Sequence, residues 1–382
     1  MLTKLTKSFL FIVIGIIANS CIEKFDPDID DYDDQLVVHG LITNLDEPYI
    51  IRLSKTSPLD EPEFRPFTGA TVYVEDDEGN NYAFPEVEPG IYQTNSFTGE
   101  VGTSYRLDIV TAAGDVYQSD YQELLNSSDI DSVYTVTETR PTEDPYYDEV
   151  GLQFYVSTQM ISSNQLYYMW QLEETYEFNS DYPIEYTYSG RFTPYPYPLE
   201  FFTCWATNQI EDVFLFDASD LSSNELQKVP LQYVNTETRK LSIRYSLMTN
   251  QFVINEDTYE FFKSVQEMNS GGDLLYSIQP YQITGNIECL SNPDEKVLGL
   301  FWVAGKSSKR IFIDRPENML FYYEICPVNT QGVPFISNYS PSDWPLYLTY
   351  NNVGVLGIVG RSCVDCTQRG GFLAKPDFWI DK

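Results

Sequence analysis

Leu36-Val37-Val38-His39-Gly40-Leu41-Ile42 is the stretch from which the fold of this chain can be worked outward. Its β-branched and apolar residues favour a strand. Similar short runs follow at intervals of about ten residues, the spacing typical of a β-sandwich. These predicted strands cover residues 49–53, 70–74, 82–84, 90–92, 102–109 and 116–119.

The alternation within these strands predicts which side chains are buried. Tyr105, Leu107 and Ile109 fall on one face, so we expect them in the core, and Arg106 and Asp108 in water. The predicted N-terminal domain is an immunoglobulin/prealbumin-like β-sandwich over residues 36–128. The order of its strands resembles prealbumin-like or carboxypeptidase-regulatory-like modules, and this likeness concerns the fold alone.

A connector at 126–129 leads to a larger, β-rich second domain, predicted over residues 129–382. One short helix is expected in it. Asn255 can cap this helix, and its apolar face would consist of Phe261, Val265 and Met268 before Gly271-Gly272 ends it. Because only one helix is predicted among many strands, the expected fold class is mainly β. The predicted strands of this domain cover residues 132–137, 152–156, 166–172, 240–245 and 297–303.

The first 20 residues read as a lipoprotein signal peptide. Lys4 and Lys7 precede an apolar run over residues 9–18, which is too short for a permanent transmembrane helix, and Cys21 follows. Cys21 is the predicted lipidation site, and the acyl chains would hold the protein on a membrane. The alternative is an ordinary cleaved signal followed by a chance cysteine.

Residues 21–35 form a predicted acidic tether. Asp26, Asp28 and Asp30 match the first ligand positions of a calcium loop. The match fails where Asp31 replaces the required glycine and Val37 replaces the final glutamate. We therefore expect no calcium site there.

Charge limits the choice of partners. The 382 residues include 57 acidic and 23 basic ones, and the formal net charge is −34. A chain without a basic footprint is not expected to bind nucleic acid, nor to adhere to anionic lipid without an anchor. The acidity favours solubility, and attraction of cations or cationic peptides is the alternative.

Few residues point to catalysis. His39 is the one histidine, and there is no G-x-S-x-G, H-E-x-x-H, P-loop or G-x-G-x-x-G signature. We predict that the protein is not an enzyme and has no cofactor or metal. Paired carboxylates among the 57 acidic residues keep a hydrolase open as an alternative.

Five cysteines follow Cys21, so at least one has no partner within the chain. In an oxidising envelope the expected state is disulfides. Cys363 and Cys366 also have the C-x-x-C spacing of redox and metal-binding motifs. The further ligands that a metal would need, and the βαβ unit that a thioredoxin-like role would need, are missing. We expect bridges that pin the C-terminal tail, with Cys204 and Cys326 as partners and the connectivity open.

An aromatic and proline-rich segment over residues 182–205 is the candidate binding surface. Its alternate prolines, around Pro194-Tyr195-Pro196, predict an extended loop. The aromatic side chains would either cover their own domain or bind a partner or sugar. The candidate residues are Tyr182, Tyr186, Tyr188, Tyr195, Tyr197 and Trp205.

Several segments carry a resemblance to a family. They are Val38-His39-Gly40-Leu41-Ile42-Thr43, Gly69-Ala70-Thr71-Val72, Gly285-Asn286-Ile287 with Val297-Leu298-Gly299, the ending Cys363-Val364-Asp365-Cys366-Thr367-Gln368-Arg369-Gly370-Gly371, and Lys375-Pro376-Asp377-Phe378-Trp379. The chain resembles the Bacteroidota lipoproteins of domain-of-unknown-function family 4249.

The resemblance implies an outer-membrane lipoprotein, lipid-anchored and facing the cell surface, that accompanies a TonB-dependent outer-membrane transporter. It implies no catalytic residues. The expected role is that of an accessory or substrate-capturing partner of the transporter barrel, with the ligand unknown. A surface hydrolase of glycans or peptides and a structural or adhesive envelope protein remain the alternatives.

We predict that Cys21→Ser releases the protein from membranes, because the acyl chains are its expected anchor. Membrane fractionation and labelling with a radioactive fatty acid would check this. Unchanged fractionation without incorporated label would contradict it.

Overall fold

The computed structural model describes residues 34–57, 63–95, 97–144, 146–161, 165–221, 223–270 and 283–381. The signal peptide, Cys21 and the tether up to residue 33 lie outside these residues. Within them the protein is mainly β, as predicted, and most strands belong to two sandwiches.

The first sandwich encloses a core that includes Val38, Ile51, Tyr105, Leu107 and Ile109. One of its sheets contains β1 (Leu36–Thr43), β2 (Tyr49–Lys55), β3 (Arg65–Pro66), β6 (Glu86–Glu88), β7 (Ile91–Thr94) and the first half of β21 (Leu298–Asp314). The facing sheet contains β4 (Thr71–Asp76), β5 (Asn81–Phe84), β8 (Ser104–Val110), β9 (Val116–Ser119), β10 (Gln122–Glu123) and β20 (Ile287–Cys289).

The second sandwich is built around Phe154, Trp170, Tyr245 and Leu247. One sheet consists of β13 (Tyr167–Asn179), β16 (Thr203–Gln209), β17 (Phe214–Asp217), β19 (Arg244–Ile254) and the second half of β21. The other consists of β11 (Ile130–Pro141), β12 (Asp148–Gln159) and β18 (Glu225–Asn235).

Strand β21 joins the two sandwiches. Its first half runs parallel to β1, from Val37 opposite Leu298 to Thr43 opposite Ala304. Its second half runs antiparallel to β19, from Val253 opposite Gly305 to Arg244 opposite Asp314. The sandwich predicted over residues 36–128 is therefore completed by β20 and β21, which the sequence alone placed in the second domain.

The connector between the sandwiches is fixed by a buried polar network. The Ser128 carbonyl accepts hydrogen bonds from Gln251 Nε2 at 2.8 Å and from Ser307 Oγ at 2.7 Å. Trp170 Nε1 donates to Gln251 Oε1 at 3.0 Å. These bonds satisfy polar groups that would otherwise be costly to bury, and they tie the connector to β19 and β21.

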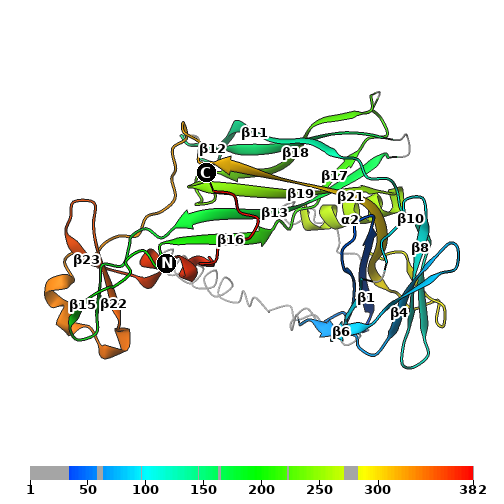
Figure 1. The fold of residues 1–382 in the computed structure, drawn as a ribbon, viewed down its shortest axis with the longest axis horizontal. Coiled ribbons are helices and arrows are strands. Elements are labelled where there is room, and N and C mark those ends of the chain that lie inside the picture. Colours follow the sequence, from blue (N-terminus) through cyan, green and yellow to red (C-terminus); the bar gives the residue numbers. More distant parts are fainter. Residues whose placement is uncertain are drawn as a thin grey trace, which may run out of the picture.

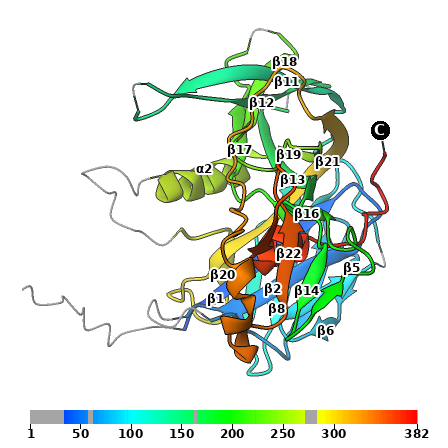
Figure 2. The same cartoon turned by 90° about the vertical axis from the view of Figure 1, so that its left-hand side faces the viewer.

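Helix α2 (Glu256–Ser270) confirms the predicted helix and its cap, because the Thr258 N–H donates to Asn255 Oδ1 at 2.9 Å. Phe262 meets Trp302 edge-on with a centroid separation of 5.4 Å, so the helix covers the outer face of the large sheet (Figure 2). Met268, expected on the apolar face, is exposed.

Two local predictions were wrong. Asp108 was expected in water, but its side chain is 3% exposed because it pairs with Arg106 Nε at 3.2 Å and accepts from Gln118 Nε2. The strand predicted at 240–245 begins only at Arg244, because residues 236–243 form turns.

A distal lobe, defined here as residues 182–202 and 326–369, lies at the opposite end of the long axis from the first sandwich (Figure 1). Its sheet has the strand order β15-β14-β22-β23. The elements of the lobe are β14 (Tyr186–Tyr188), β15 (Phe192–Pro194), β22 (Leu346–Tyr350), β23 (Leu356–Val359), α3 (Arg361–Val364) and the 3-10 helices Val333–Asn338, Pro341–Asp343 and Cys366–Arg369.

In the part of the chain that the structure describes, no helix is both long enough and apolar enough to span a bilayer.

Substitution of Gly299 would test how much the close approach of β21 to β1 contributes to stability. Its φ is +87°, and a Cβ added there would lie 1.9 Å from the Val38 carbonyl oxygen. We expect Gly299→Ala to lower the free energy of unfolding by about 3 kcal/mol or more, from backbone strain and the clash together. Chemical denaturation would measure it.

Gly79→Ala is the matched control. Gly79 has a φ of +88° and no atom within 4 Å of the added Cβ. Only backbone strain, which destabilises a left-handed alanine by about 1–2 kcal/mol, is therefore expected. Equal losses in the two variants would show that the close approach of β21 to β1 is unimportant for stability.

Candidate functional site

The segment predicted as an extended loop over residues 182–205 folds instead as part of the distal lobe. Residues of β14 pair with β15 on one side and with β22 on the other. Pro194 lies in the edge strand β15, opposite Tyr186. Proline is compatible with an edge strand, because no strand lies on its outer side to require a hydrogen bond from the missing N–H. The sequence prediction overlooked this possibility.

Most of the six candidate aromatic residues pack within the protein. Tyr188 is buried between Phe192 and Trp344, with ring centroids 5.2 and 5.9 Å away. Tyr182 donates from its hydroxyl to the Cys326 carbonyl at 3.0 Å. These two rings therefore hold the lobe together.

The remaining candidates differ in exposure. Burial and the hydrogen bond to Glu200, at 2.9 Å, raise the pKa of Tyr195 to about 12. Trp205 forms a two-way backbone bridge with Phe372 and meets Trp379 edge-on at 6.5 Å. Tyr197 is 69% exposed. Tyr186 is half-buried against the cluster around Tyr188, and its ring centroid lies 6.5 Å from that of Tyr350. Tyr197 therefore remains as the exposed contact residue of the six.

Two disulfides fix the lobe. Cys326 is bonded to Cys363 within it, and Cys366 is bonded to Cys204 at the start of β16. The expected pinning of the tail by Cys204 and Cys326 is confirmed, and the open connectivity is now assigned. Cys289 is a free, buried thiol in the first sandwich.

Asp181 connects the lobe to the second sandwich. Its side chain is 1% exposed and accepts from Arg239 at 2.5 Å and from Arg369 at 2.7 Å. It also accepts from the Cys326 backbone N–H at 3.0 Å. Two arginines and a backbone donor offset the cost of burying this carboxylate.

Asp181, Cys326 and Cys363 also place three potential metal-ligand atoms within 4.8 Å of one another. The two sulfur atoms are bonded to each other, and the carboxylate is held by two arginines. These atoms are therefore committed to structural bonds in the oxidised protein.

The distal lobe exposes several large apolar side chains. Among them, Phe335 is 63% exposed and Val353 is 81% exposed. Such side chains cluster at interaction surfaces more often than on inert ones. The other large exposed apolar side chains of the lobe are Phe192, Tyr197, Leu199, Tyr350 and Val355.

The lobe is also nearly uncharged. It contains four carboxylates and three arginines, whereas the whole chain has a net charge of −34. Arg361 pairs with Asp365 at 3.1 Å, and Arg369 pairs with Asp181. The lobe itself therefore contributes little to the negative charge of the protein. The charged residues are Glu185, Glu200, Asp343, Asp365, Arg191, Arg361 and Arg369.

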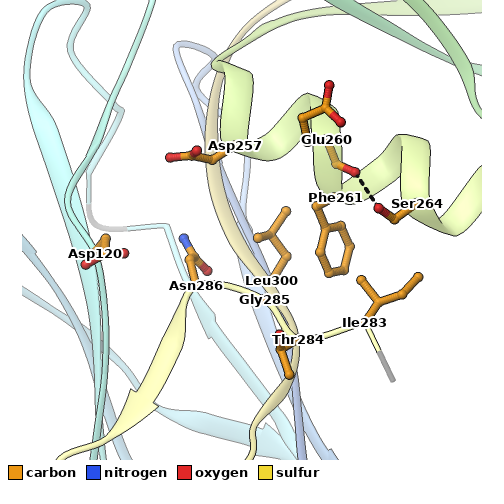
Figure 3. A pocket seen from close by; sticks show the side chains of 10 residues that line it. All are labelled: Asp120, Asp257, Glu260, Phe261, Ser264, Ile283, Thr284, Gly285, Asn286 and Leu300. Atoms are coloured by element: carbon orange, nitrogen blue, oxygen red, sulfur yellow. Dashed lines mark hydrogen bonds between the residues drawn. The ribbon is translucent and has the colours of Figure 1, made fainter. Parts of the chain in front are cut away.

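A cleft of about 570 Å³ lies between α2 and the segment that leads into β20 (Figure 3). Phe261, Ile283 and Leu300 line its apolar side, and Asp120 and Asp257 lie toward the other side. The two acidic residues of α2 at this cleft, Asp257 and Glu260, both have structural roles.

Asp257 stands in the first turn of α2, where a negative charge stabilises the helix. Glu260 pairs with Lys263 at 3.2 Å. We therefore assign no catalytic or binding role to the residues of this cleft. His39, the other candidate, lies in β1 opposite Arg52 with its side chain exposed.

A family model matches residues 22–310, and its description is Domain of unknown function (DUF4249). The chain belongs to this family. The match runs through both sandwiches of this DUF4249 member and ends within β21, and the predicted membership of family 4249 is thereby confirmed. The cysteine-rich ending, which carries part of the resemblance, lies beyond the matched residues. No curated protein matches the chain.

The disulfides should make stability depend on redox state. Cys204 and Cys366 are 162 positions apart in the sequence. Closing a loop of this size reduces the entropy of the unfolded chain by an amount equivalent to about 5 kcal/mol at most. We expect dithiothreitol to lower the denaturation midpoint of the wild type and to open the lobe to proteases.

Cys289→Ala is the matched control, because it removes a cysteine without removing a disulfide. It should keep the full response to dithiothreitol, whereas Cys204→Ser with Cys366→Ser should lose most of it. Identical unfolding curves of the wild type with and without reductant would contradict the assigned disulfides.

Proposed function

We propose that this DUF4249 protein is a lipid-anchored outer-membrane lipoprotein that serves as an accessory or substrate-capturing partner of a TonB-dependent transporter. In this proposal the distal lobe docks on the transporter barrel. The signal-like N-terminus supports the anchor, and the family resemblance supports the class of partner.

The observation that carries the proposal is the set of exposed apolar side chains on the nearly uncharged distal lobe. A polyanionic protein is repelled by anionic headgroups and by acidic partners, and an uncharged apolar end can approach both. The two disulfides and the buried Asp181 network hold this end in one shape. A preformed surface loses less entropy on binding than a flexible one.

The place where the described chain begins supports the same arrangement. Asp34, where the described chain begins, pairs with Arg65 at 2.5 Å and with Lys55 at 3.6 Å on the first sandwich. These contacts lower the pKa of Asp34, chiefly through the hydrogen bond from Arg65.

The length of chain from Cys21 to Asp34 can span roughly 45 Å when fully extended. The anchor would thus restrain the first sandwich and leave the lobe, at the other end, free to meet a partner. Such tethering raises the effective concentration of the lobe at the membrane.

The hydrolase alternative gains little from the described carboxyl groups. Glu177 is the one among them whose pKa is raised, by burial first and by the charge of Asp381 second. It lies on β13, opposite Trp205 and Arg244, and Trp379 of the C-terminal tail covers this end of the sheet. This location is on a covered sheet face rather than in the cleft.

Affinity purification from detergent-solubilised outer membranes, followed by mass spectrometry, would test the proposal. We expect the wild type to retain a TonB-dependent barrel and Tyr197→Ser with Phe335→Ser to retain about tenfold less, because exposed aromatic anchors dominate binding. Both side chains are exposed, so the melting temperature should stay nearly constant.

Tyr146→Ser is the matched control, since Tyr146 is 96% exposed on the second sandwich and lies outside the lobe. It should retain the barrel fully. A wild-type protein that purifies without a barrel would refute the transporter partnership.

A further inference from the structure

The two disulfides of the distal lobe lie in different surroundings. Cys204 and Cys366 are fully buried in a small apolar cluster. In the other bond Cys363 is buried, whereas Cys326 is partly exposed. A thiol reductant in water can therefore approach the Cys326–Cys363 bond from the Cys326 side, while the Cys204–Cys366 bond is covered by protein.

A guanidinium group lies against the partly exposed sulfur. Arg369 Nη2 donates to Cys326 Sγ at 3.3 Å and to Asp181 Oδ2 at 2.7 Å. Arg369 Nε donates to the Ser362 carbonyl at 2.8 Å. Because the side chain is bonded on two sides, its positive charge is fixed beside this sulfur.

The carboxylate of Asp181 does not cancel this charge. It lies within 4.8 Å of the sulfur atoms of Cys326 and Cys363, where it would by itself oppose a second negative charge. Arg239 also pairs with it, at 2.5 Å. Two guanidinium groups and one carboxylate therefore leave one positive charge in excess beside the disulfide.

A cation in this position favours the reduced state over the disulfide. The sulfur of a disulfide is neutral, whereas an ionised thiol carries a negative charge that a neighbouring Arg stabilises. A disulfide becomes easier to reduce when one of its thiolates is stabilised in this way. The contact of Arg369 therefore makes the bond of Cys326 easier to reduce.

We propose that the Cys326–Cys363 bond is a redox-sensitive clasp that opens before the Cys204–Cys366 bond. The thiolate of a thiol reductant, RSH, attacks Cys326 Sγ, the S–S bond breaks, and Cys363 leaves as a thiolate that takes up a proton. A second RSH displaces Cys326 from the mixed disulfide and releases it as a thiolate beside Arg369. Two RSH are thereby oxidised to RSSR, and their two protons pass to Cys363 and to water. The clasp does not depend on the proposed function.

Opening of the clasp would loosen the outer part of the lobe. The cysteines of the clasp are 37 positions apart, and the segment between them carries β22, β23 and two 3-10 helices. Among the contacts that remain are a short ladder between β14 and β22 and two small apolar clusters. The bond between Cys204 and Cys366 still attaches the tail to β16. The expected result is a looser outer lobe on an intact frame.

Redox titration of the full-length protein in detergent would test the order of opening. The protein is equilibrated at pH 9 with graded mixtures of reduced and oxidised glutathione, quenched with acid and alkylated, and each cysteine is quantified by peptide mass spectrometry. We expect the Cys326–Cys363 bond to be half reduced at a value of [GSH]²/[GSSG] about tenfold or more below that of the Cys204–Cys366 bond. Equal values, or the reverse order, would overturn the clasp.

Arg369→Gln tests the role of the charge, because glutamine keeps a hydrogen-bond donor without the cation. Half reduction of the Cys326–Cys363 bond should then require a value about tenfold higher at pH 9, where the thiol is ionised. The difference should disappear at pH 6, where the thiol is protonated, and a purely structural role of Arg369 would not follow pH in this way. Arg369→Lys should restore most of the wild-type value.

Arg191→Gln is the matched control, since Arg191 is an exposed arginine of the same lobe in the turn between β14 and β15. It should leave the titration unchanged. Equal values for the wild type and Arg369→Gln at pH 9 would overturn the assigned role of the cation.

Limited proteolysis tests the loosening. Cys326→Ala with Cys363→Ala mimics the open clasp, and chymotrypsin should cleave residues 327–362 about threefold faster or more, because local opening exposes them. Cys289→Ala, which removes a cysteine without removing a disulfide, should be cleaved like the wild type. Unchanged cleavage of the double variant would show that the bond does not control the lobe and would overturn the switch.

Discussion

The architecture depends on the double pairing of one strand. β21 continues from a parallel ladder with β1 into an antiparallel ladder with β19, so it belongs to the cores of both sandwiches. The parallel half is possible because Gly299 lets β21 approach the Val38 carbonyl more closely than any side chain would allow. The sandwiches are therefore parts of one continuous frame, and a hinge between them is not expected.

The frame and the distal lobe are stabilised by different means. The frame relies on large apolar cores and on the buried network around Gln251. The lobe has smaller apolar clusters, and it is held by two disulfides and by Asp181 between two arginines. Small units commonly need such cross-links because they bury too little surface. This division lets the frame hold the lobe at a fixed distance from the first sandwich.

Local patterns predicted much of the frame. Alternating apolar residues gave the strands around Val38, Val72 and Leu107, and the capping pattern at Asn255 gave the helix. Periodicity could not reveal the pairing of β1 with β21, because these strands lie near opposite ends of the chain. Register between such distant segments is set by tertiary packing rather than by a local turn. The domain boundary at 128 therefore omitted two strands.

The candidate surface was predictable in part. The sequence located the aromatic segment and the four disulfide-bonded cysteines, but it did not show that Tyr182 and Tyr188 are internal. It also missed the exposed turn between β22 and β23, because Val353 and Val355 lie in a short run that looks like an ordinary turn. The signal that could have found it is Asn351 followed by Gly354 between two apolar runs, with a valine on either side of the glycine.

Electron cryomicroscopy of the protein purified together with the proposed barrel partner would test the central claim most directly. We predict that the distal lobe forms the interface and that the first sandwich lies outside the contact. A complex in which the lobe faces solvent, and the cleft beside α2 or the first sandwich contacts the barrel, would contradict it.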